Sequence, residues 1–314
     1  MTIYKKHNNS PIDIILNTNL NKILMYYSNE KKNNNTILIT INYDNTMRRL
    51  MEITDYFMLS TRMKCKLETN EFSPYELFTN AYNKKIKLNY GDIKHMLKNN
   101  SCTLLDFTRI IYLLNKLLPN NQNIKYLDCS AGWGDRILAS LLYGVSEYRG
   151  YDPNILLKKG HSELKNYVFN NNLNGFYQKN NKKSNIKNFK IIYKPFEISY
   201  KDEDNLQNYF DICISSPPFF IFEIYSNMET QSVSKNSTVN DWVNNFLYPS
   251  FIKILKMLKP NGYICWYLED KPEYLFMDEF LNFTKTLQCI YNGKIGFKFD
   301  DANETRFFNI WQKV

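Results

Sequence analysis

The chain has 314 residues, 44% hydrophobic and 16% aromatic, which is enough apolar material for one large globular domain or two smaller ones and excludes a disordered tail protein. It carries 40 Lys and Arg against 31 Asp and Glu, a formal charge of +9, which favours polyanionic partners over basic ligands. Its heavy use of Asn, Lys, Ile, Tyr and Phe is also what AT-rich codons supply, so genome composition is an alternative source of the charge.

The first hundred residues carry no motif that indicates chemistry. Helix-like patches cover 47–60 and 74–82, and a strand-like run covers 36–43. We expect residues 1–100 to form a small accessory region. Apolar residues at helical spacing then predict a helix over 103–118.

Strands and helices alternate along the rest of the chain. Predicted strands cover 124–130, 148–153, 189–195, 210–215 and 263–269, and predicted helices cover 135–144, 154–169 and 241–259. Two further strands, 289–299 and 306–313, would form a terminal hairpin. The alternation predicts parallel βαβ units, which bind ligands at the carboxyl ends of their strands.

Neither a membrane nor a metal is expected. No segment approaches the roughly 18 apolar residues of a membrane span, and the opening residues do not resemble a signal peptide. The six cysteines never reach a C-x-x-C spacing, and only three histidines could join them in a zinc site. We therefore expect an intracellular protein of a reducing compartment, cytoplasmic or nuclear.

The first motif is DCSAGWG at 128–134, with Asp128 at a strand end and Gly132 and Gly134 in the turn before a helix. Glycine is needed where the backbone turns sharply and a ligand approaches closely. A pyrophosphate-binding G-x-G-x-x-G would require glycine where Ile137 stands, so a dinucleotide is disfavoured.

An acid follows the next predicted strand. Asp152 lies about one helix and one strand beyond Gly134, and an ionised aspartate can accept hydrogen bonds from both hydroxyls of a diol. A tight turn with a structural aspartate is the alternative interpretation of these residues.

The second motif, Ser216-Pro217-Pro218-Phe219, follows the strand predicted at 210–215. Two prolines fix φ and remove two backbone donors, which leaves a rigid platform of acceptors. A flat substrate could donate the two N–H bonds of an exocyclic amine to the Ser216 side chain and the Pro217 carbonyl, while Phe219 stacks on its ring. A loop after a buried strand is the alternative.

In this order the two motifs resemble those of class I S-adenosylmethionine-dependent amino-methyltransferases of the (D/N/S)PP(Y/F) type, such as DNA cytosine-N4 and adenine-N6 methyltransferases. The resemblance spans roughly 103–314. It implies a Rossmann-like α/β fold, with a mostly parallel seven-stranded sheet and a terminal antiparallel hairpin, in a catalytic domain over 101–314. Residues 1–100 could then recognise the substrate.

The resemblance also implies which residues form the site. S-adenosyl-L-methionine would be the cofactor, bound by Asp128, Ser130, Gly132, Trp133, Gly134, Asp152 and Phe196. The amine would be held and activated by Ser216, Pro217, Pro218 and Phe219. Many relatives have Phe at the position of Ser130, and Trp133 either covers the cofactor or fills the core.

The expected activity is methyl transfer to the exocyclic amine of a nucleobase, adenine N6 or cytosine N4, after extrusion of the base. DNA is expected in preference to RNA. The alternatives are an RNA base, a protein side-chain amide, or a non-catalytic nucleic-acid-binding subunit that keeps the fold. The stretch 221–240 is a candidate lid, in which Glu223 and Tyr225 could contact the base. Lysines between 164 and 196 could contact phosphates, and 170–190 is expected to be a mobile loop. Nothing in the sequence indicates an oligomeric state.

Overall fold

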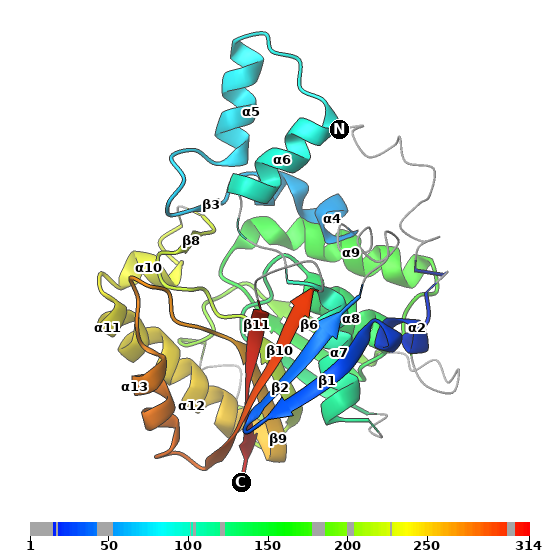
Figure 1. Cartoon of the computed structure of the whole chain (residues 1–314), viewed down its shortest axis with the longest axis vertical. Coiled ribbons are helices and arrows are strands. Elements are labelled where there is room, and N and C mark those ends of the chain that lie inside the picture. The colour runs from blue at the N-terminus through cyan, green and yellow to red at the C-terminus, as the bar shows by residue number, and fades with distance from the viewer. Residues whose placement is uncertain are drawn as a thin grey trace.

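A nine-stranded sheet lies at the centre of the molecule (Figure 1), in the order β1-β2-β10-β11-β9-β7-β4-β5-β6. The computed structural model describes residues 15–16, 18–42, 53–100, 102, 105–119, 123–177, 186–199, 204–226, 228–299 and 305–314. The opening residues and residues 178–185 of the loop predicted at 170–190, which include Lys179, Lys182 and Lys183, lie outside these ranges.

Five neighbouring strands of this sheet run parallel. They are β4 (Lys125–Asp128), β5 (Glu147–Tyr151), β6 (Asn188–Ile192), β7 (Phe210–Ser215) and β9 (Leu258–Tyr267). Strands β10 (Cys289–Phe299) and β11 (Thr305–Lys313) form the antiparallel hairpin expected from the sequence. The predicted α/β class, a mostly parallel Rossmann-like sheet with a terminal hairpin, is therefore confirmed.

The sheet is wider than the seven predicted strands. The accessory residues supply β1 (Tyr27–Asn33) and β2 (Thr36–Ile41), and β2 pairs in parallel with β10. Gly293 allows this pairing because its φ is +93° and a Cβ there would lie 1.8 Å from the Asn35 carbonyl oxygen. The strand-like run at 36–43 thus extends the main sheet.

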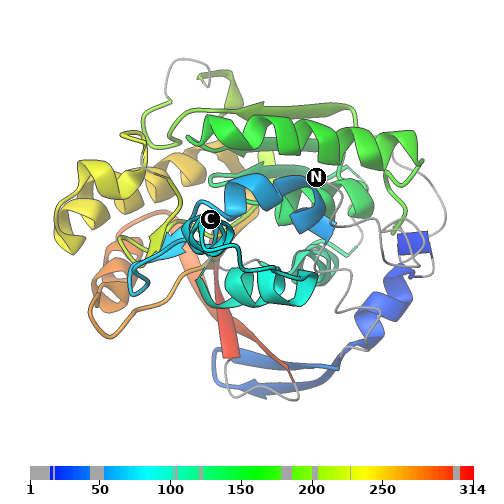
Figure 2. The same ribbon diagram turned by 90° about the horizontal axis from the view of Figure 1, so that it is seen from above.

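Helices cover both faces of the sheet (Figure 2). They are α7 (Phe107–Leu117), α8 (Asp135–Tyr143) and α9 (Lys158–Asn170) on one face, and α12 (Tyr248–Met257) and α13 (Met277–Thr284) on the other. The single helix predicted over 241–259 is instead α11 (Val239–Trp242), a π-helical turn (Val243–Leu247) and α12. Pro249 explains the break, because it has no N–H to donate to the carbonyl four residues earlier.

The accessory region also contributes α2 (Leu20–Met25), α4 (Ile53–Arg62), α5 (Pro74–Asn83) and α6 (Tyr90–Asn100). Helices α5 and α6 stand above the edge of the sheet where the parallel strands end (Figure 1). Within the described ranges, no helix has both the length and the apolar character needed to cross a bilayer. All six cysteines are described, and they form no disulfide.

Candidate functional site

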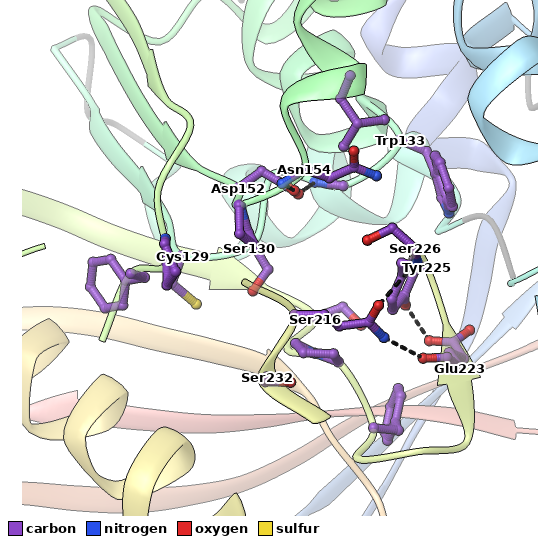
Figure 3. Close-up of a pocket in the computed structure, with 18 of the residues that line it drawn as sticks. Cys129, Ser130, Trp133, Asp152, Asn154, Ser216, Glu223, Tyr225, Ser226 and Ser232 are labelled. Carbon is purple, nitrogen blue, oxygen red and sulfur yellow. Dashed lines mark hydrogen bonds between the residues drawn. The ribbon is translucent and has the colours of Figure 1, made fainter. Parts of the chain in front are cut away.

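A cavity opens where β4, β5 and β7 end, walled by the loops that follow these strands and β6 (Figure 3). Most of the residues singled out from the sequence reach it. Ser130, Gly132, Trp133, Asp152, Phe196, Ser216, Pro218 and Phe219 line the cavity, whereas Asp128, Gly134 and Pro217 do not.

The turn between β4 and α8 depends on its two glycines. Gly132 has a φ of +56° and Gly134 a φ of +90°, both in the left-handed region that disfavours residues with a Cβ. A Cβ on Gly134 would also lie 3.0 Å from a methyl carbon of Leu164. Gly132 brings the backbone to the cavity wall, while Gly134 lets α8 start and pack against α9.

Asp128 lies beneath this turn and is fully buried. Its carboxylate accepts hydrogen bonds from Arg136 Nε (2.9 Å), the Tyr148 hydroxyl (2.9 Å) and Ser215 Oγ (2.7 Å). The Ser130 N–H donates to it as well, at 3.2 Å. Asp128 therefore links the turn, α8, β5 and the end of β7, and its carboxylate faces protein donors.

Asp152, just after β5, lines the cavity directly. Its Oδ2 accepts the Gly132 N–H at 2.8 Å, and its Oδ1 accepts the Asn154 N–H at 2.9 Å. Burial raises the pKa of Asp152 to about 6, so the carboxyl is mostly ionised at neutral pH. The site therefore presents a negative charge beside the glycine turn.

His161, on α9, holds the glycine turn in place through a hydrogen bond. Its Nε2 lies 2.8 Å from the Gly132 carbonyl oxygen, which can only accept, so Nε2 carries the proton. Its Nδ1 then accepts from the Tyr193 hydroxyl at 3.1 Å. Burial lowers the pKa of His161 to about 4, so the ring is neutral at pH 7. No sequence pattern predicted this role for His161.

The segment after β6 brings Phe196 and Glu197 to the cavity. The ammonium of Lys253 donates to the Phe196 carbonyl at 2.6 Å and lies 4.4 Å from the centre of the Phe196 ring. The ring also packs edge-on against Tyr151. Phe196 is thus fixed in place, and the adjacent Glu197 adds a second acid, whose pKa burial raises.

The diproline segment leaves β7 at Ser215 and forms another part of the wall. Ser216, Pro218 and Phe219 line the cavity, and Pro217 is buried behind them. The Phe219 ring packs edge-on against Tyr267 with centroids 5.5 Å apart. In Figure 3, Ser216 lies between the group formed by Ser130 and Asp152 and the group formed by Glu223 and Tyr225.

The chain after the diproline segment folds back over the cavity through β8 (Glu223–Ile224). The Tyr225 hydroxyl donates to the buried Glu223 carboxylate, and the Tyr225 ring lies 5.7 Å from that of Trp133. The Gln231 side chain accepts the Ser226 N–H at 3.0 Å. The stretch predicted as a lid thus contributes six described residues between Glu223 and Ser232 to the cavity wall.

The accessory region completes this wall. Strand β3 (Lys66–Leu67) pairs antiparallel with β8, which places Leu67 opposite Glu223. On α4, the Thr54 hydroxyl donates to Asp135 at 2.9 Å, and Asp135 lines the cavity. Burial raises the pKa of Asp135 to about 7. Residues far apart in sequence therefore meet around one site.

Several lining residues were not anticipated from the sequence. They are Asn154, Glu197, Thr230, Gln231, Ser232 and Arg306. The sequence held a signal for four of them. Glu197 adjoins the predicted cofactor-binding residue Phe196, and residues 230–232 lie in the predicted lid. Arg306 had none, since it comes from the terminal hairpin. Within the described part of the chain, no group of three His, Cys, Asp or Glu side chains is arranged to hold a metal.

No protein-family model and no curated protein matches the sequence. Among solved structures, SMU.1697c from Streptococcus mutans in complex with SAH is similar with a TM-score of 0.41 and 15% identity, over 65% of this chain and 97% of that chain. The delta-N METTL16 MTase domain gives a TM-score of 0.41 and 16% identity, over 65% and 80%. An rRNA methylase from Streptococcus thermophilus gives 0.40 and 12%, over 68% and 99%. With TM-scores below 0.5, these similarities assign no function to the chain.

Proposed function

We propose that this protein is an S-adenosylmethionine-dependent N-methyltransferase that acts on the exocyclic amine of a nucleobase, adenine N6 or cytosine N4, in DNA. One observation carries the proposal. The Gly132 turn and the Asp152 carboxylate share a single cavity with Ser216 and Phe219. A methyl donor held by the first pair would lie beside an amine held by the second, as group transfer requires.

The cavity has the unmatched polar atoms that a polar cofactor would satisfy. Trp133 Nε1, Thr230 Oγ1 and Ser232 Oγ are buried and have no hydrogen-bond partner among the described residues, and all three residues line the cavity. Buried polar groups are nearly always paired in folded proteins. These atoms therefore support a ligand rich in donors and acceptors.

S-adenosylmethionine would supply an electrophilic methyl group on a positively charged sulfur. Asp152 would accept hydrogen bonds from its ribose hydroxyls, and the Gly132 turn would let its amino-acid part approach the backbone. Phe196 would lie against its adenine ring. The acids Asp152 and Glu197 suit a cationic ligand. Asp128 would act as a positioning residue, because its carboxylate faces protein donors.

On the amine side, Ser216 Oγ would accept one N–H bond from the cavity wall. The Pro217 carbonyl would accept the other after it turns toward the cavity, which Pro217 does not line in this structure. The lone pair of an aryl amine is delocalised into its ring and is weakly nucleophilic. Two fixed acceptors draw the nitrogen toward tetrahedral geometry and return that lone pair to the nitrogen. The Phe219 ring, held by Tyr267, would stack on the base. No general base is required, since the proton can leave after methyl transfer.

Methyl transfer from radiolabelled S-adenosylmethionine tests the proposal. Single-stranded DNA, duplex DNA and RNA are compared, and the products are digested to nucleosides. We expect label in the N6-methyldeoxyadenosine or N4-methyldeoxycytidine released from DNA. Label in RNA alone would show that the polymer is RNA and not DNA, and no transfer to any of the three would refute methylation of a nucleobase.

Variants separate the two halves of the site. Ser216→Ala should abolish transfer and leave cofactor affinity unchanged, because Ser216 is assigned to the amine. Ser162→Ala is the matched control, since that serine is exposed on α9 and donates only to the Lys158 carbonyl. Equal activities of the two variants would contradict the role given to Ser216.

A further inference from the structure

The accessory residues 64–100 form an arm with a small core of its own. Leu59 and Met63 pack with Ile93 and Leu97 of α6, and Phe78 of α5 covers them. This cluster is separate from the main core, so the arm is held as a unit on α4. Figures 1 and 2 show the arm above the edge of the sheet where the parallel strands end, which is the edge that carries the cavity.

The tip of the arm is basic and free of acids. The chain between α5 and α6 reads KKIKLN at 84–89, and Lys84, Lys85 and Lys87 are all exposed. None of the three forms an ion pair within the described residues. The nearest acid along the chain, Asp92, is used in a helix cap, where it accepts the Asn89 N–H at 2.7 Å. Among the described residues, no carboxylate is therefore paired with these three positive charges.

Apolar surface accompanies this charge. Tyr82 is 74% exposed and Ile86 is 55% exposed, and neither belongs to the arm's own core. Toward the base of the arm, Tyr75 is 49% exposed and carries the Lys64 ammonium 5.9 Å from its ring centre. Lysines interleaved with exposed tyrosines suit an unpaired nucleic-acid strand, whose phosphates meet the ammonium groups while its bases stack on the rings.

The base of the arm also pairs with an element that lines the cavity. Strand β3 at its base pairs with β8, and Glu223 of β8 lines the cavity. Helix α5 has 10 residues, so the tip stands about 15 Å beyond this base. A strand whose target base enters the cavity would reach the tip with nucleotides a few positions along the chain from that base.

We propose that the α5–α6 tip, with Lys84, Lys85, Lys87 and Tyr82, binds the single-stranded DNA segment that flanks the target base. The inference rests on the function proposed above and deepens it, because it assigns substrate binding to residues 82–87. Duplex DNA is disfavoured as the occupant, because its bases are stacked and do not offer their faces to Tyr82.

The test measures the binding of a fluorescent single-stranded DNA oligonucleotide by anisotropy, with the full chain and without cofactor, between about 50 and 200 mM salt. The variant Lys84→Gln/Lys85→Gly/Lys87→Gln should flatten the slope of log K against log salt by about 2, since each phosphate contact on a single strand contributes about 0.7. Lys85 has a φ of +58°, so glycine there removes the charge and suits the backbone. Thermal unfolding checks that the variant is folded.

Matched variants control for charge and for stacking. Lys32, Lys256 and Lys285 are exposed and lie near the opposite edge of the sheet, and their change to Gln should leave the slope as it is. Tyr82→Ala should weaken binding at least about fivefold, whereas Tyr82→Phe keeps the ring and should bind normally. Equal binding by the tip variants and the wild-type chain would overturn the proposal. Duplex DNA and RNA are measured in the same way, and a loss of binding confined to either of them would also overturn the proposal.

Methyl transfer to a trinucleotide, which is too short to span from the cavity to the tip, separates this inference from the proposed function. If the tip variants lose DNA binding while even the wild-type chain transfers no methyl group, the arm is supported and the enzymatic proposal fails. If methyl transfer proceeds and the tip variants bind DNA normally, the proposed activity is supported and DNA binding by the tip is refuted.

Discussion

The backbone N–H of Gly132 donates a 2.8 Å hydrogen bond to the Asp152 carboxylate, so the turn after β4 and the acid after β5 are joined. The other oxygen of the same carboxylate accepts the Asn154 N–H. A single side chain thus accepts backbone hydrogen bonds from two loops while it faces the cavity. A change at Asp152 should therefore alter ligand binding and also weaken the contact between the two loops.

We expect Asp152→Asn to raise the Kd for S-adenosylmethionine at least about tenfold, because charged hydrogen bonds contribute about 1.5–3 kcal/mol each. Titration calorimetry measures this affinity, and thermal unfolding follows the fold. Asp278→Asn, in the exposed first turn of α13, is the matched control. An unchanged Kd in Asp152→Asn would remove this residue from the cofactor site.

Acid should weaken the fold through His161. Burial lowers its pKa to about 4 in the folded chain, against about 6.5 when unfolded, so the unfolded state binds more protons between these values. The stability that the neutral ring contributes is complete above pH 6.5 and is lost as the pH falls toward 4. The wild-type chain should lose about 2 kcal/mol between pH 6.5 and pH 5 through this group alone.

His161→Gln should remove that loss, since a glutamine amide can donate to the Gly132 carbonyl and does not titrate. Urea unfolding at pH 7, 6 and 5 gives the free energies. The exposed His95 is the control, and His95→Gln should keep the wild-type pH slope. Parallel slopes for the wild-type chain and His161→Gln would show that the ring is not held neutral.

The hydrogen bonds that Asp128 accepts from Arg136, Tyr148 and Ser215 should contribute strongly to the free energy of unfolding. Ser215→Ala removes one hydrogen bond to a buried charge and should cost about 1.5–3 kcal/mol of unfolding free energy. Asp128→Ala should cost more, about 3–5 kcal/mol, because it leaves the Arg136 guanidinium buried without its carboxylate. Urea unfolding measures both, with Ser162→Ala as the surface control. A cost below 1 kcal/mol for Asp128→Ala would contradict the network.

Local patterns were sufficient to predict the frame of the parallel sheet and its terminal hairpin. The period of apolar residues and the glycine and proline breakers located the strands that end at Asp128 and Ser215, as well as the terminal hairpin. They also predicted that residues after those strands would meet at one edge, because the carboxyl ends of parallel strands share an edge.

What the sequence could not indicate was pairing between distant segments. The run at 36–43 had a strand pattern, but nothing local specifies that β2 joins β10 or that β3 joins β8. For the same reason Arg306 was not predicted to line the cavity, because nothing local indicates that the start of β11 reaches it. Gln231 lies in an irregular segment, where no period marks which side chains face the cavity. The sequence also could not indicate that Asp128 accepts its hydrogen bonds from protein side chains, because those three partners lie on α8, β5 and β7.

The hydroxyl of Tyr225 should matter for the substrate. Burial raises the pKa of Tyr225 well above its ordinary value, so the hydroxyl stays protonated and donates to the Glu223 carboxylate beside the diproline segment. Tyr225→Phe frees that carboxylate to turn, and we expect kcat/KM for the oligonucleotide to fall about tenfold with the cofactor Kd within about twofold, a loss of order 1.4 kcal/mol. Tyr274→Phe is the matched control, since its hydroxyl also donates to a glutamate, Glu68, but Tyr274 lies outside the cavity lining. If both variants kept wild-type kcat/KM, the Glu223 side of the cavity would have no part in holding the substrate.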